Sequence, residues 1–96
     1  MENQPDFKLE LTAETAPGRY TNFAVISHLP NEFMFDFALV LPQQPALVVS
    51  RVLTSPRHAK AFMKALQENL QRYEAMFGEI EEITPPRGAG SVTPTN

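Results

Sequence analysis

The apolar positions between Ser55 and Gly78 recur at the spacing of an α-helix. They form one stripe on a helix about 30 Å long, and comprise Ala59, Phe62, Met63, Leu66, Leu70, Tyr73 and Phe77. Ser55 is a good N-cap, Pro56 fits the first helical position, and Gly78 suits a left-handed exit after the last turn. We therefore predict a helix over residues 56–77 whose apolar stripe must be covered.

Four segments before this helix have patterns typical of β-strands. Residues 7–11 alternate apolar and charged side chains, which predicts a short edge strand with one face in water. Residues 20–28, 32–41 and 46–54 are more continuously apolar, so both faces of these strands are expected to be at least partly covered. The phenylalanines of residues 32–41 share one face, and this face is the expected seat of the helical stripe.

One pair of charges fixes the expected register of the last two strands. If residues 42–45 form the whole loop between them, Leu41 faces Ala46 and Asp36 lies opposite Arg51. A cross-strand pair of this kind contributes about 0.2–1 kcal/mol when exposed and disfavours register slips.

The expected fold class is α+β. We predict an antiparallel β-meander of about four strands, followed by one long C-terminal helix packed on one sheet face, in a chain that forms a homodimer or larger oligomer through the other face. A single domain over residues 7–83 is expected between flexible segments at 1–6 and 84–96. The apolar residues assigned to the oligomer face are Phe23, Val25, Met34, Ala38, Val40 and Val49.

Composition narrows the possible classes of function. The chain has 96 residues, a formal net charge of −3 and no cysteine, so disulfide frameworks and thiolate chemistry are excluded. A chain of this length has a thin core, which favours self-association. No stretch approaches the roughly 20 apolar residues of a membrane span, and we expect a cytoplasmic protein.

Candidate chemistry is sparse. His28 and His58 lack accompanying ligands, so no metal site is expected, and the serines lie outside any nucleophile elbow. Glu32 and Asp36 share a strand face, but Asp36 already has Arg51 as its partner. We expect no enzymatic activity, no catalytic residue and no cofactor.

A basic cluster at the start of the helix is the most distinctive charged feature. It consists of Arg51, Arg57, His58, Lys60 and Lys64. Together with the free N–H groups of a helix start, these side chains could hold a phosphate, an acidic peptide or a nucleic-acid backbone. The alternative is an ordinary solvated helix face, because short charge runs usually lie on the surface.

Several short motifs follow one another along the predicted strands and the helix: Tyr20, Asn22, Ser27, Glu32, Phe33, Asp36, Phe37, Arg51, Val52, Ser55, Pro56, His58, Ala59, Lys60, Leu66, Asn69, Tyr73, Glu74, Phe77 and Gly78. In this order and spacing they resemble a family of small bacterial and archaeal proteins known as domain-of-unknown-function family 3467. The resemblance covers about residues 7–80, with Phe35 as one departure, where an aliphatic residue is expected. It implies a cytoplasmic prokaryotic-type protein and supplies no activity, cofactor or catalytic residue.

Two functions therefore remain open. The first is a non-catalytic, homo-oligomeric protein-interaction or scaffold module that binds itself and another protein. The alternative is an oligomeric nucleic-acid or anion binder that uses the basic cluster.

Overall fold

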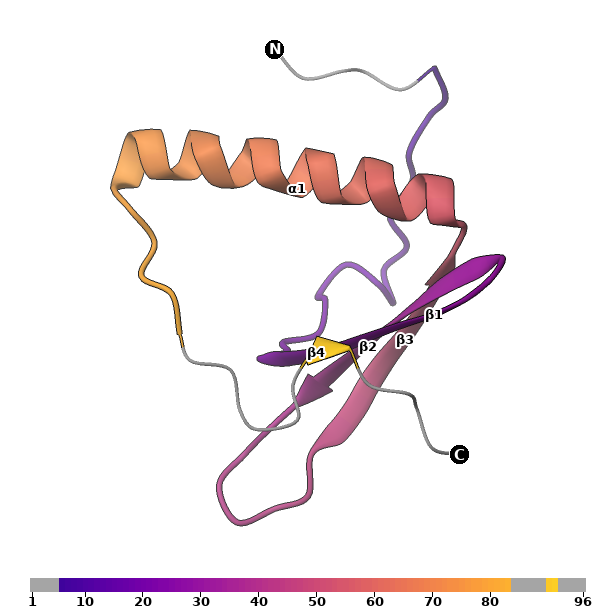
Figure 1. Cartoon of the computed structure of the whole chain (residues 1–96), viewed down its shortest axis with the longest axis vertical. Coiled ribbons are helices and arrows are strands. Elements are labelled where there is room, and N and C mark those ends of the chain that lie inside the picture. Colours follow the sequence, from indigo (N-terminus) through magenta and orange to yellow (C-terminus); the bar gives the residue numbers. More distant parts are fainter. Residues whose placement is uncertain (1–5, 84–89, 92–96) are drawn as a thin grey trace.

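The computed structural model describes residues 6–83 and 90–91. The chain forms a small α+β fold in which three antiparallel strands precede one long helix (Figure 1). A fourth strand of two residues completes the sheet, whose order is β3-β2-β1-β4. The elements are β1 (Phe23–Leu29), β2 (Glu32–Leu39), β3 (Leu47–Thr54), α1 (Pro56–Phe77) and β4 (Gly90–Ser91).

The three longer strands confirm the predicted meander, with slightly different bounds. The strand expected over residues 7–11 is wrong, because this segment has no regular structure and its apolar side chains are largely exposed. The edge of β1 is instead paired in parallel with β4, through Val25 with Gly90 and Ile26 with Ser91. Gly90 and Ser91 lie in the segment expected to be a tail, whose other residues, like residues 1–5, are outside the described part of the chain.

The pairing of β2 with β3 places Asp36 opposite Arg51, as predicted. The register shifts between Phe37 and Ala38, so that Ala38 faces Val48 and the pairing expected beyond this point is displaced by one residue. Such a β-bulge accommodates one extra residue in one strand. The predicted register is therefore correct on one side of the bulge only.

Two short connections hold the meander together. Pro30 and Asn31 form a two-residue turn between β1 and β2, where Leu29 pairs with Glu32. In the longer loop before β3, Gln43 adopts a left-handed conformation with φ of 61°. This conformation reverses the chain between Pro42 and Pro45.

Helix α1 begins and ends where the sequence predicts. The side-chain oxygen of Ser55 accepts a hydrogen bond from the N–H of His58, and Pro56 occupies the first turn. At the other end Gly78 has φ of 100° and donates its N–H to the Glu74 carbonyl. Local capping chemistry thus sets both ends of the helix.

The position of α1 differs from the expected packing along the phenylalanine face. Its first turns approach β2, where the rings of Phe35 and Phe62 lie 5.7 Å apart. Its later turns extend away from the sheet (Figure 1), and no residue of the helix is buried. Only one residue, Ser55, separates β3 from α1, so the end of β3 dictates the direction of the helix.

The described part of the chain has a very small core. Ala38 is the buried apolar residue, at 3% exposure, and Ser27 and Asp36 are the buried polar residues. A sheet with one distant helix cannot enclose more, and much of the apolar surface stays in contact with solvent.

Candidate functional site

The apolar stripe of α1 is the first candidate surface in the fold. From its second turn onward, the large side chains of the stripe are all exposed, and Phe77 is the extreme case at 68%. Tyr73 and Phe77 stack against each other with ring centroids 4.9 Å apart. Soluble monomers rarely leave a contiguous apolar patch larger than about a few hundred Å² in water. The stripe is therefore a surface on which another polypeptide can pack.

A shallow apolar hollow lies where α1 leaves the sheet. Its volume is about 340 Å³, and its lining is mostly aromatic and aliphatic. His58 and Phe62 from the helix face Phe35 and Phe37 from β2 and Val52 from β3 across it. The hollow adjoins the apolar stripe, so it can receive a side chain from whatever packs on the helix.

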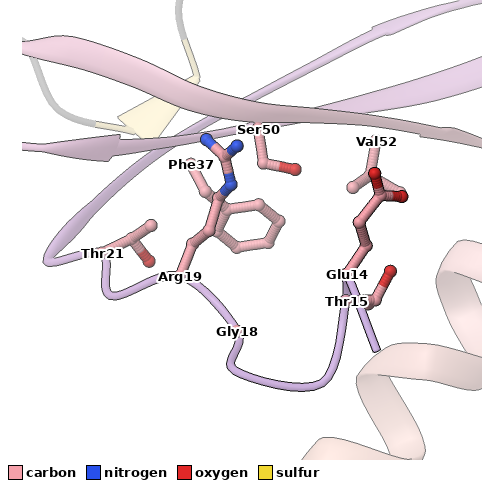
Figure 2. Close-up of a pocket in the computed structure, with 8 residues that line it drawn as sticks. All are labelled: Glu14, Thr15, Gly18, Arg19, Thr21, Phe37, Ser50 and Val52. Atoms are coloured by element: carbon pink, nitrogen blue, oxygen red, sulfur yellow. The ribbon is translucent and has the colours of Figure 1, made fainter. Parts of the chain in front are cut away.

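A second, more polar hollow of about 730 Å³ opens over the same sheet face (Figure 2). The loop over residues 14–21 forms one side, and Phe37, Ser50 and Val52 form the floor. The guanidinium of Arg19 reaches over this floor and donates a hydrogen bond to the Val49 carbonyl over 3.0 Å. This hydrogen bond ties the loop to β3.

Asp36 and Arg51 form a bidentate ion pair on the opposite sheet face from α1. The hydrogen bonds from Arg51 lower the pKa of Asp36 below its usual value, although burial of the carboxyl group acts in the other direction. The same hydrogen bonds raise the pKa of Arg51. The pair neutralises a carboxylate whose side chain is only 7% exposed, so its role is structural.

The structure does not bring all members of the basic cluster together. Arg51 is held by Asp36, whereas Arg57 and Lys64 lie on the side of α1 opposite the apolar stripe, and Lys60 lies at the edge of the stripe. His58 lines the apolar hollow instead. Two cations therefore share the outer helix face, and Lys60 borders it.

The predicted oligomer face is only partly accessible in a single chain. Ala38 is buried, whereas Val40 is exposed at 39%. The other members, Phe23, Val25, Met34 and Val49, are half-buried. The helical stripe exposes larger apolar side chains than this face does.

Comparison with known proteins identifies the family. The family model described as "Protein of unknown function (DUF3467)" matches residues 1–82. The chain belongs to this family. No curated protein and no solved structure gives a significant match.

Other features of this DUF3467 protein bear on its chemistry. No helix in residues 6–83 is long and apolar enough to cross a membrane. Within the described ranges, no group of three histidine, aspartate or glutamate side chains is arranged to hold a metal ion.

Sequence reasoning missed the role of Asn22 in this DUF3467 protein. The Asn22 side-chain amide donates to the Val40 carbonyl over 3.0 Å and accepts from the Val40 N–H over 2.8 Å. It thereby acts as a strand partner just beyond the end of β2. An asparagine at the start of a strand-like apolar run is the signal that could have suggested this capping role.

Proposed function

We propose that this protein is a non-catalytic protein-interaction or scaffold module that works as a homo-oligomer. One observation carries the proposal: α1 has no buried residue, although it bears a continuous apolar stripe. A helix with this pattern gains most of its stability from packing its apolar face. A second polypeptide that covers the stripe supplies the packing that a single chain lacks.

A second copy of the chain is the first occupant to consider, because it carries the same exposed apolar stripe. Self-association leaves the exposed segment over residues 7–11 and the Val40 side of the sheet for another protein. The proposal keeps the cytoplasmic location expected from the cysteine-free sequence.

The native mass of the purified protein tests this function. We expect a dimer or larger species at micromolar concentration by size-exclusion chromatography with light scattering. Leu70→Glu should give a monomer, because it places a charge in the centre of the stripe. Gln71→Glu is the matched control on the exposed side of the same turn, and it should behave like the native protein. A native protein that runs as a monomer would contradict the proposal.

Nucleic-acid or anion binding by the basic cluster is the second candidate function. It is favoured by the exposure of Arg57, Lys60 and Lys64 near the start of one helix. A chromatographic peak that carries nucleic acid at low salt and sheds it at high salt would support it. Arg57→Ala combined with Lys60→Ala should then weaken the binding. If titration with DNA and with RNA at low salt detects no binding, this second candidate function is contradicted.

A further inference from the structure

The apolar stripe of α1 has a finer pattern than that of an ordinary amphipathic helix. Its members recur in alternating steps of four and three residues, which is the spacing of the core positions of a coiled coil. Phe62 lies beside this series and contacts Phe35 of the sheet. The core series is Ala59, Met63, Leu66, Leu70, Tyr73 and Phe77.

We propose that two copies of α1 pack side by side in antiparallel orientation, as a short two-stranded coiled coil around a two-fold axis near Gln67. This proposal rests on the self-association proposed above, and it adds the surface and the orientation. The sizes of the core side chains, the charges beside them and the position of the apolar hollow all favour this orientation.

Side-chain size supports the antiparallel orientation. The core series begins with a small residue, Ala59, and ends with two large ones, Tyr73 and Phe77. In a parallel pair each layer would contain two identical side chains, so one end would be underpacked and the other crowded. In the antiparallel pair Ala59 meets Phe77, Met63 meets Tyr73, and two leucines meet at the centre. Such layers of similar total volume pack more evenly.

The residues that flank the core are also complementary in this orientation. In an antiparallel pair, flanking positions at similar distances from the two-fold axis meet on the same side of the interface. On one side, Lys60 of each copy meets Glu74 of the other, and Gln67 meets its own counterpart. On the other side, Phe62 meets Met76, and Asn69 meets its counterpart. Each residue therefore has a partner of matching chemistry.

The apolar hollow fits the same arrangement. Met76 is the most exposed large apolar side chain of the helix, at 76%. Because it meets Phe62 of the other copy, it arrives at the hollow that Phe62 lines together with Phe35 and Val52. The last turn of each helix would thus be covered by the sheet of its partner.

Cysteine cross-linking distinguishes the orientations, because the native chain has no cysteine. A single cysteine in Gln67→Cys should cross-link two copies through a short bis-maleimide reagent, because this position lies next to the two-fold axis. Met63→Cys should not, because the two copies of residue 63 are separated by about 15 Å along an antiparallel pair. Ala61→Cys, on the outer side of the helix, controls for random collisions. Cross-linking through residue 63 but not residue 67 would overturn the antiparallel proposal and leave self-association standing.

Charge reversal gives an independent test. Lys60→Glu should raise the dimer dissociation constant at least about tenfold, because it places glutamates against each other at two symmetric sites. Combining it with Glu74→Lys should restore the native value, and mixing the two single variants should yield a heterodimer. Lys64→Glu, with the same charge change on the outer face, should have no effect on the native mass. An unchanged dissociation constant in Lys60→Glu would contradict the antiparallel proposal, whereas a native monomer would contradict self-association itself.

Discussion

The guanidinium of Arg51 binds both carboxylate oxygens of Asp36 across β2 and β3. Its Nε lies 2.6 Å from Oδ1 and its Nη2 lies 3.0 Å from Oδ2. The carboxylate is buried in the sheet face, whereas the arginine side chain remains 45% exposed. The pair therefore joins the central strand to an edge strand and leaves the arginine partly hydrated.

Removing only the arginine should be more harmful than removing both charges. Arg51→Met leaves the Asp36 carboxylate buried without its partner, and we expect the thermal unfolding midpoint to fall by several degrees. Adding Asp36→Val should recover most of this loss, because apolar side chains can replace an ion pair at little cost. Thermal unfolding followed by circular dichroism checks both variants, with Arg57→Met as the exposed control. A double variant less stable than Arg51→Met alone would contradict this explanation.

The same pair makes stability depend on acid pH. Because the pKa of Asp36 is lower in the folded chain than the usual value of about 3.9 in an unfolded one, folding favours the ionised form. Its contribution is present above about pH 4 and is lost as the pH falls through the lower folded-state pKa. The unfolding midpoint of the native protein should therefore fall more steeply below pH 4 than that of Asp36→Asn. If the unfolding midpoints of the two proteins fell equally with pH, the loss of stability in acid would come from other carboxylates.

The amide of Asn22 should be worth about 1 kcal/mol of folding stability, because its two hydrogen bonds to Val40 are exposed and water can replace them in part. We expect Asn22→Ala to lower the urea midpoint without changing the slope of the transition. Asn22→Asp keeps the acceptor oxygen and loses the N–H donor. Its urea midpoint should therefore lie between those of the native protein and Asn22→Ala. An unchanged midpoint in Asn22→Ala would show that the amide contributes nothing.

Replacing the buried hydroxyl of Ser27 by an apolar side chain should stabilise the fold. The residue is 7% exposed, and its hydroxyl oxygen has no hydrogen-bond partner among the described residues. Ser27→Ala removes a buried hydroxyl without adding bulk, and it should raise the free energy of unfolding by about 0.5–1 kcal/mol. Equilibrium urea unfolding measures this change. A loss of stability instead would indicate that the hydroxyl is hydrogen-bonded in solution.

The features that sequence reasoning predicted are those set by local chemistry. Ser55, Pro56 and Gly78 mark the ends of α1 because capping depends on a few neighbouring residues. The pairing of Asp36 with Arg51 was also predicted correctly, although the register expected next to the loop is displaced by one residue. The β-bulge between Phe37 and Ala38 offsets this displacement before Asp36. No feature of the amino-acid sequence predicts the bulge itself.

The wrong or incomplete predictions concern relations between distant segments. Alternation over residues 7–11 is typical of a strand, but a strand also needs a partner, and β4 occupies the free edge of β1. The path of α1 depends on how the chain turns at Ser55, which periodicity does not encode. Of the candidate surfaces, the apolar stripe could be read from spacing, whereas the separation of Arg51 from the other cations required the register of the sheet.

The two-residue turn at Pro30 and Asn31 has a kinetic consequence. It brings β1 and β2 together over a very short loop, so that the sheet is built mainly from contacts that are close in sequence. Folds of this kind have a low entropic barrier to chain closure and fold rapidly. We expect stopped-flow refolding to show a fast phase that is independent of protein concentration. Burial of the α1 stripe should follow as a second-order phase whose rate rises with concentration.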